Sequence, residues 1–321
     1  MRIRKLLFKR TTLIKALPYT LSAMCIVYLL WGIDSNELAI AFRALSSQSV
    51  VVAQCILLLS FIPSSFRLAL ITNNEADKMT SFRAVAVGIA TNTLLPLRLG
   101  EVAKVFVLNR NAHMPIERAM RAVFWERLAD LNCLLLLALA TVSLLDVPVA
   151  LLPLSIIVGL LWASLYCLKT RPHWFATLTA RLPSASLKNF CNRALAALSE
   201  SRKISYYFKI AAYTITIWLV FMGFIYYLVS TGTGLDLNNG QIMTVILASI
   251  LGVAIPSAPA GIGVYESLVA GALIVAGASK EQALAIAVVL HILQLLIPTL
   301  IGLLFMPVAL FRLRELHRKA D

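Results

Sequence analysis

Two short stretches of the sequence place charged side chains beside proline and glycine. The first, NTLLPLRLGEVAK (residues 92–104), contains Arg98 and Glu101, and the second, PSAPAGIGVYE (residues 256–266), ends in Glu266. An arginine guanidinium donates paired hydrogen bonds to a carboxylate or a phosphate. Backbone that leaves a helix also exposes N–H groups that bind anions. The chemistry indicated by the first stretch is therefore recognition of an anionic group, such as a phosphate.

A third stretch, WERLAD, supplies further charges at Glu126, Arg127 and Asp130. Residues four apart share one face of a helix, so the two carboxylates lie together with the arginine close by. With Lys104 and Arg98, these residues predict a polar cavity lined by carboxylates and cations. We expect Arg98, Lys104 and Arg127 to be able to hold a phosphate there.

Each of these charges also has a purely structural interpretation. Glu126 and Asp130 could lock neighbouring helices together, and Arg98 could extend to the membrane surface. Glu101 and Glu266 each follow a glycine and could stabilise the positive end of a helix dipole. The sequence leaves these alternatives open.

The sequence contains none of the common signatures of nucleotide, metal or hydrolytic chemistry. It has no Walker A pattern, no dinucleotide-binding glycine fingerprint, and no HExxH, CxxC or GxSxG. Its five cysteines are scattered without the spacing of a metal site. We therefore expect no cofactor and no metal.

The composition predicts the class of protein. Of 321 residues, 60% are hydrophobic and only 14% are charged, against about 25% charged in soluble domains. The net charge of +14 comes from basic residues clustered between apolar runs, which is typical of cytoplasmic loops and argues against a nucleic-acid partner. We expect an all-α polytopic protein of the cytoplasmic (inner) membrane.

The apolar runs predict about six full transmembrane helices and four shorter pieces. A spanning helix needs about 20 residues. The expected spans are 17–33, 47–72, 120–145, 147–168, 210–229 and 282–310. The short pieces, 82–96 with 101–109 and 241–254 with 264–276, flank the two opening stretches, so we expect each pair to form a re-entrant hairpin.

The basic residues orient this arrangement. Their distribution also fits two full crossings that cancel, but the short half-segments favour the hairpins. With both hairpins re-entrant and both termini cytoplasmic, only Arg43 and Lys280 of 29 basic residues fall outside. The first hairpin then enters from the cytoplasm and the second from the outside. This is an inverted repeat, typical of secondary transporters. Within a single membrane domain (residues 1–321), the first repeat covers about 15–145 and the second about 147–310.

One long hydrophilic stretch, residues 169–209, lies between the fourth and fifth expected spans, on the cytoplasmic side. It holds eight lysines or arginines and one acidic residue, interspersed with large apolar residues. This pattern predicts amphipathic helices on the inner leaflet, where basic residues meet anionic lipids. A solvated linker is the alternative.

The motifs NTLLPLRLGEVAKVFVLNR, ERLAD and PSAPAGIGVYE resemble those of the lysylphosphatidylglycerol synthase transmembrane family, also called flippase-like integral membrane proteins. The resemblance covers about residues 15–310. In the first motif it rests on Asn92, Pro96, Arg98, Gly100 and Glu101. In the second it rests on Pro256, Pro259, Gly261, Gly263 and Glu266. Two positions depart from the family pattern: Ala260 replaces a usual glycine, and His291 stands where many relatives carry arginine.

The charged residues and the motifs together give a set of expected functional residues. The expected substrate-binding residues are Asn92, Arg98, Glu101, Lys104, Glu126, Arg127, Asp130, Glu266 and His291. The expected hairpin breaks are Pro96, Gly100, Pro256, Pro259, Gly261 and Gly263.

The resemblance also implies translocation of lipids. The expected function is a flippase that moves an anionic phospholipid or a polyprenyl-phosphate-linked lipid between leaflets. The alternatives are an integral membrane transferase, or its subunit, acting on a lipid phosphate, and a membrane scaffold. The soluble aminoacyl-transferase domain of bifunctional relatives is absent from these residues, so synthesis of lysyl lipid by this chain alone is not expected. Expected partners are membrane lipids, with a second copy or a lipid-modifying enzyme as further candidates.

Overall fold

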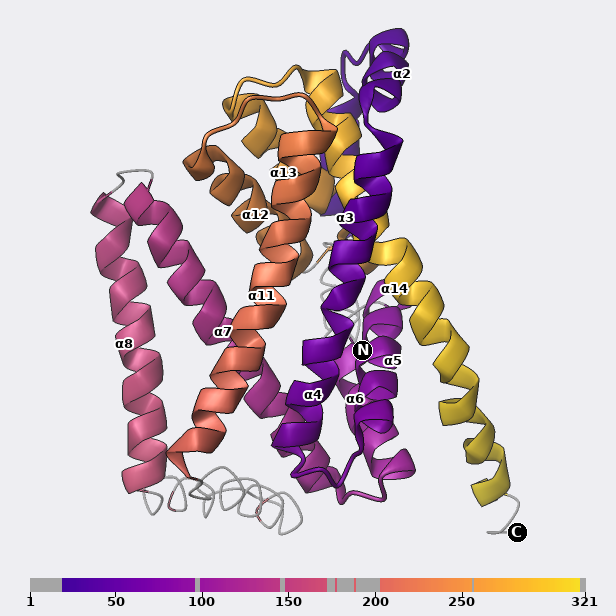
Figure 1. Ribbon diagram of the computed structural model, residues 1–321, viewed down its shortest axis with the longest axis vertical. Coiled ribbons are helices and arrows are strands. Elements are labelled where there is room, and N and C mark those ends of the chain that lie inside the picture. Colours follow the sequence, from indigo (N-terminus) through magenta and orange to yellow (C-terminus); the bar gives the residue numbers. More distant parts are fainter. Residues whose placement is uncertain are drawn as a thin grey trace, which may run out of the picture. The chain divides into compact units, whose positions relative to one another are not determined.

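The computed structural model describes residues 19–95, 99–144, 148–171, 203–255 and 257–317, together with residues 177 and 188. Every regular element in these residues is helical, which confirms the predicted all-α class. After a first helix, Tyr19–Leu30, the elements are α2 Ser35–Ala44, α3 Ser47–Leu59, α4 Phe61–Ile71, α5 Lys78–Leu94, α6 Gly100–Asn111, α7 Ile116–Leu144, α8 Pro148–Thr170, α11 Ile204–Gly232, α12 Asn239–Ala254, the 3-10 turn η2 Pro259–Gly261, α13 Val264–Val275 and α14 Lys280–His317 (Figure 1).

Three helical segments among the described residues are long and apolar enough to cross a membrane. They are Ser47–Ile71, Ile204–Gly232 and Lys280–Met306. A fourth span results if Tyr19–Leu30 and Ser35–Ala44, which are bent by 93°, count as one. Large apolar side chains on these helices remain exposed, among them Val51, Ile62, Leu219, Leu296 and Leu304. Such apolar surface suits contact with lipid, and the protein is a multi-pass membrane protein.

A helix that was not expected from the sequence lies between the expected spans 17–33 and 47–72. Residues Ser35–Ala44 form α2. The Asp34 carboxylate accepts hydrogen bonds from the backbone N–H groups of Asn36 and Glu37, at 2.7 and 3.2 Å. This N-cap satisfies N–H groups that have no partner inside the helix, so a short polar sequence can start a helix here.

The two proline- and glycine-containing stretches interrupt helices. Helix α5 ends at Leu94 and α6 begins at Gly100, while α12 ends at Ala254 and α13 begins at Val264. Proline has no N–H to donate and disfavours helical backbone in the residue before it, so both interruptions follow from local sequence. The prolines Pro96 and Pro256, and Arg98, lie outside the described residues.

The described residues pack into two compact units. One lies within Met1–Leu59, Ile89–Leu99 and Val220–Ile301, and the other within Ser60–Gly88, Gly100–Leu219 and Gly302–Asp321. Each unit thus draws on both halves of the sequence. The single membrane domain and its two sequential repeats stay predictions.

In the first unit, α12 and α13 pack side by side. Gln241 at the start of α12 donates a hydrogen bond to the Ala276 carbonyl just after α13 (3.4 Å). Near the other end, a Cβ on Gly252 would lie 2.7 Å from the Tyr265 Cα. The two helices are therefore antiparallel, and glycine permits their close approach.

In the second unit, α7 is the central helix. Helices α4, α6 and α8 each pack against it. Buried apolar residues from α4, α6 and α7, such as Leu68, Leu108 and Ala122, form the core. This packing brings polar residues of α4, α6 and α7 to one place.

Candidate functional site

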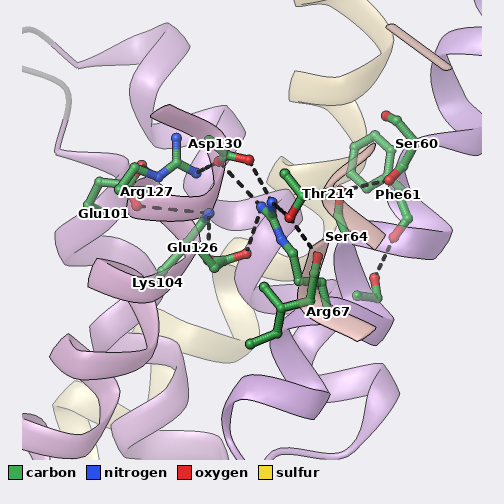
Figure 2. A network of polar contacts seen from close by, with 12 residues as sticks. Ser60, Phe61, Ser64, Arg67, Glu101, Lys104, Glu126, Arg127, Asp130 and Thr214 are labelled. Atoms are coloured by element: carbon green, nitrogen blue, oxygen red, sulfur yellow. Dashed lines mark hydrogen bonds and ion pairs between the residues drawn. The ribbon is translucent and has the colours of Figure 1, made fainter. Parts of the chain in front are cut away.

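The first candidate site centres on Arg67, a buried arginine of α4 that is 3% exposed. Its two terminal nitrogens bind both oxygens of Asp130, at 2.6 and 3.3 Å. Nη2 also binds Glu126 Oε1 at 3.3 Å, and Nη1 donates to the hydroxyl of Thr214 at 3.1 Å. Figure 2 shows the guanidinium between these partners. A paired contact of this kind is among the stronger ion pairs in proteins.

Three further charges extend this cluster. The Lys104 ammonium lies 3.2 Å from Glu126 Oε2 and 3.9 Å from Glu101 Oε2. Arg127 bridges Glu101 and Asp130, with N–O distances of 3.4 Å to each. We call Arg67, Glu101, Lys104, Glu126, Arg127 and Asp130 the ion network (Figure 2).

The ion network contains three cations and three carboxylates, so it is neutral when every group is ionised. Neutrality matters because Arg67 and Glu126 are buried, and an uncompensated buried charge costs several kcal/mol. Buried ion pairs also give back little net stability, because both ions lose their hydration. The arrangement therefore makes these charges tolerable without making them a large source of stability.

Local packing explains how Lys104 reaches the network. A Cβ on Gly88 of α5 would lie 2.9 Å from two side-chain carbons of Lys104 and 3.2 Å from the Gly100 carbonyl oxygen. Real Cβ atoms essentially never come so close, so glycine at this position leaves the path of the lysine open. On α7, Glu126 and Asp130 lie one turn apart and face Arg67 together.

Exposure rises across the ion network. The side chains of Arg67 and Glu126 are 4% and 1% exposed, whereas Glu101 is 31% and Arg127 50% exposed. Arg127 is thus the cation of the network that a molecule outside the protein can reach. Its two contacts use Nε and Nη2, and neither uses Nη1.

The second candidate site lies in the other unit, at the second helix break. His291 of α14 places Nδ1 at 2.6 Å from Glu266 Oε1 and Nε2 at 3.0 Å from the carbonyl oxygen of Ala260. The other Glu266 oxygen accepts the backbone N–H of Gly263 at 2.7 Å and so caps α13. The ring of Tyr265 stacks on His291 at 4.0 Å.

A hydroxyl cluster adjoins this pair. Tyr265 is fully buried, and its hydroxyl lies 2.9 Å from Ser249 Oγ and accepts a hydrogen bond from Gln294 at 2.6 Å. Gln294 also donates to Ser249 at 3.2 Å. Polar groups of α12, α13 and α14 are therefore joined in one hydrogen-bonded chain.

The structure groups the residues expected from sequence into two sets. The first set, in the ion network, is Glu101, Lys104, Glu126, Arg127 and Asp130. The second set, at the second helix break, is Glu266 and His291, together with Gly261, Gly263 and the η2 turn that Pro259 begins. Gly100 begins α6, and Asn92 lies in α5. The expected roles of Arg98, Pro96 and Pro256 fall on residues outside the described ones. A role in substrate binding stays a prediction for all of them.

Two findings refine the expected chemistry. Lys104 was expected to help hold a phosphate, but its ammonium is buried between two carboxylates. Glu266 caps a helix, as its structural interpretation expected, and it also contacts His291.

Sequence reasoning missed Arg67, Thr214, Ser249, Tyr265 and Gln294. A signal was present for Arg67, since it is the only charged residue in the expected span 47–72, and ionisable residues inside spans are functional candidates. The others are uncharged and carry no comparable signal. Among the described residues, no group of three histidine, cysteine, aspartate or glutamate side chains could hold a metal ion.

Comparison with known proteins identifies the family. No curated protein matches the chain. The family model described as the lysylphosphatidylglycerol synthase TM region matches residues 15–302, which include both broken segments, α7 and His291. This confirms the family expected from the motifs: the chain belongs to the lysylphosphatidylglycerol synthase transmembrane-region family.

Proposed function

We propose that the protein moves an anionic phospholipid or a polyprenyl-phosphate-linked lipid between the leaflets of the cytoplasmic membrane. Membership of a lipid-related membrane family supports a lipid substrate. The observation that carries the proposal is the half-exposed Arg127 at the edge of a charge-balanced ion network, in which Arg67, Lys104 and Glu126 are buried.

Arg127 suits a lipid phosphate for two reasons. Its contacts to Glu101 and Asp130 are both 3.4 Å long and leave Nη1 uninvolved in either, so a phosphate can form a shorter paired contact. The neighbouring carboxylates balance the positive charge, which keeps a bound anion from being held too tightly to leave. Arg98, which precedes α6, is proposed as a second phosphate ligand.

We further propose six spans with two re-entrant hairpins in an inverted repeat and both termini in the cytoplasm. The support is that both pairs of short helices, α5 with α6 and α12 with α13, break at proline- and glycine-containing motifs. Broken helices in corresponding positions of two halves are typical of transporters. Such a repeat would allow the two hairpins to open to opposite sides.

Cysteine labelling tests this topology. Single cysteines at Asn74 and Asn238 in a cysteine-free background should react with an impermeant reagent from opposite sides of the membrane, Asn74→Cys from the cytoplasm. Labelling of both from the same side would contradict the inverted repeat.

Lipid exchange in proteoliposomes tests the function. Fluorescent phosphatidylglycerol and phosphatidylcholine in separate vesicles, quenched from outside, report leaflet exchange, and chromatography of the lipids reports new products. The wild type should exchange the anionic probe faster than the zwitterionic one. Formation of a modified lipid would instead support the transferase.

Arg127→Gln provides the specific test, with Arg118→Gln as its matched control. Both arginines lie on α7 with side chains 50% and 48% exposed, and Arg118 pairs with Glu75 away from the ion network. A hydrogen bond to a charged group contributes about 1.5–3 kcal/mol, so Arg127→Gln should slow exchange about tenfold or more. Equal rates for the two variants would overturn the role of Arg127.

A further inference from the structure

The Glu266 carboxylate is paired with a histidine, whereas the carboxylates of the ion network are paired with lysine and arginine. The ring of His291 is buried, 2% exposed, and both of its nitrogens contact oxygen atoms: Nδ1 that of Glu266 and Nε2 that of Ala260. Within the described residues, the Glu266 carboxylate contacts this ring and the backbone N–H of Gly263. Among the described residues, no lysine or arginine forms an ion pair with it.

The hydrogen bonds at His291 determine how many protons the pair holds. A backbone carbonyl only accepts, so Nε2 must carry a proton to bind the Ala260 oxygen at 3.0 Å. The 2.6 Å contact between Nδ1 and Glu266 Oε1 also needs a proton between the two atoms. Either the ring is an imidazolium beside a carboxylate, or a neutral ring accepts from a protonated carboxyl.

We propose that Glu266 and His291 form a proton-binding site that holds one proton more than the neutral ring with an ionised carboxylate. With that proton the pair has no net charge and both contacts are hydrogen bonds. Without it, the pair is an anion, and at one of the two contacts lone pairs face each other. In an apolar helical segment, such an uncompensated charge is unfavourable.

Among the described residues, the groups around Glu266 and His291 are uncharged, so a proton is the charge that neutralises the pair. The titratable group that the described residues place against the pair is Tyr265 of α13, whose ring stacks on His291. Its hydroxyl is bound to Ser249 of α12 and Gln294 of α14. The first helix contributes Ser22, a neutral group, at the same loop, where it accepts the N–H of Ala258.

The proton also bears on the conformation of the second broken segment. Ala260, Gly261 and Gly263 have φ angles of 62°, 84° and 87°, and left-handed backbone is unfavourable for alanine by about 1–2 kcal/mol. His291 forms a hydrogen bond with the Ala260 carbonyl, and Glu266 accepts one from the Gly263 N–H. Loss of the proton would break the contact of His291 either to Ala260 or to Glu266. One side of the loop between these residues would then no longer be held to α14.

Coupling of this site to lipid movement rests on the proposed function, whereas the proton site itself does not. On that basis the coupling ion is H⁺: the protonated pair holds the second break closed, and proton release permits it to rearrange. A proton gradient would then drive or accelerate lipid exchange.

Spectroscopy of the full chain in lipid nanodiscs tests the proton site without any transport assay. The sequence has four histidines, and ¹⁵N-histidine NMR reports the protonation of each ring, with His291 assigned by the signal lost in His291→Gln. If that variant does not fold, substitution of the other three histidines assigns it by elimination. Infrared spectra report a protonated carboxyl as a C=O band, assigned by its loss in Glu266→Gln.

At neutral pH we expect Nε2 of His291 to be protonated. Alongside it, we expect either an imidazolium with no Glu266 carboxyl band, or a neutral ring with that band present. A neutral ring beside an ionised carboxylate would overturn the proposal, and so would an imidazolium beside a protonated carboxyl.

A second arm tests coupling in proteoliposomes. A pH gradient should change lipid exchange by the wild type and by the control Glu281→Gln, which alters a carboxylate in the first turn of the same helix, α14. Glu266→Gln should lose this response. An unchanged response in Glu266→Gln would overturn the coupling, while the absence of any exchange by the wild type would overturn the proposed function and leave the spectroscopic result standing.

Discussion

Replacing Arg67 should destabilise the protein far more than replacing an arginine in an equally short ion pair at the surface. Arg67 and Arg118 each have one N–O contact of 2.6 Å to a carboxylate. Their side chains differ in burial, being 4% and 48% exposed. Arg67 also binds the second Asp130 oxygen, Glu126 and Thr214. A comparison of Arg67→Met with Arg118→Met therefore measures the effect of burial together with that of these added contacts.

The expected magnitude follows from the charges left behind. Without Arg67, the ion network keeps two cations and three carboxylates, and Asp130 loses a paired contact. Breaking a buried pair costs about 3–5 kcal/mol, whereas an exposed pair contributes about 0–1 kcal/mol. Arg67 Nε is buried without a hydrogen-bond partner among the described residues, so we expect a loss near the lower limit, about 3 kcal/mol.

A double variant tests whether charge imbalance is the cause. Asp130→Asn combined with Arg67→Met restores equal numbers of cations and carboxylates. The hydroxyl of Thr214 still donates to the Ile210 carbonyl at 2.8 Å, so the loss of Arg67 leaves it satisfied. The double variant should therefore be more stable than Arg67→Met alone.

The free energy of unfolding, measured in mixed micelles with increasing denaturing detergent, provides the comparison. The order of stability should be wild type and Arg118→Met, then the double variant, then Arg67→Met. The reasoning is refuted if Arg67→Met loses no more stability than Arg118→Met, or if adding Asp130→Asn lowers stability further.

Four further substitutions test local features by the same measurement. Gly263→Ala would place a Cβ 2.6 Å from a backbone carbonyl oxygen of the first helix, at a φ of 87°. It should therefore lower the free energy of unfolding by more than about 2 kcal/mol. Gly271→Ala, which has open space around its Cβ, should be neutral or stabilise by up to about 1 kcal/mol. Tyr265→Phe removes a buried hydroxyl whose two partners also bond to each other, so a loss of about 1 kcal/mol is expected. Asp77→Ala removes the N-cap contact to the Thr80 N–H at 2.9 Å and should cost about 1 kcal/mol at neutral pH. Hydrogen bonds from the Thr80 side chain and backbone lower the pKa of Asp77. The contribution of Asp77 to stability is therefore complete above the ordinary carboxyl pKa and is lost as pH falls through the lowered pKa. A stability difference between wild type and Asp77→Ala that persists in strong acid would contradict this.

The helix breaks could be predicted because their causes are local. Proline and glycine act within one or two residues, so α12 and α13 end and begin at the expected positions, Ala254 and Val264. Helix α2, between the expected spans 17–33 and 47–72, was not predicted because the capping role of the Asp34 carboxylate was missed. That signal was also local and was available in the sequence.

The pairing of charges could not be predicted in the same way. Sequence placed Glu126 and Asp130 on one helix face, but their partner Arg67 comes from a helix about 60 residues earlier. Only the packing of α4 against α7 determines that pairing. Likewise, Tyr265, Ser249 and Gln294 are unremarkable in sequence, and their connection depends on how three helices meet.

The two sites place carboxylates beside the broken segments and neutralise them by different means. In the ion network, lysine and arginine supply charges that do not leave, so Glu126 and Asp130 stay balanced whatever the surroundings. At the second break, Glu266 faces a histidine, which balances a carboxylate only while the pair shares a proton. The family resemblance places arginine at position 291 in many relatives, and an arginine would neutralise Glu266 permanently. The histidine therefore converts a fixed ion pair into one that can gain and lose charge, which gives this chain an exchangeable proton at one break and permanent counter-charges at the other.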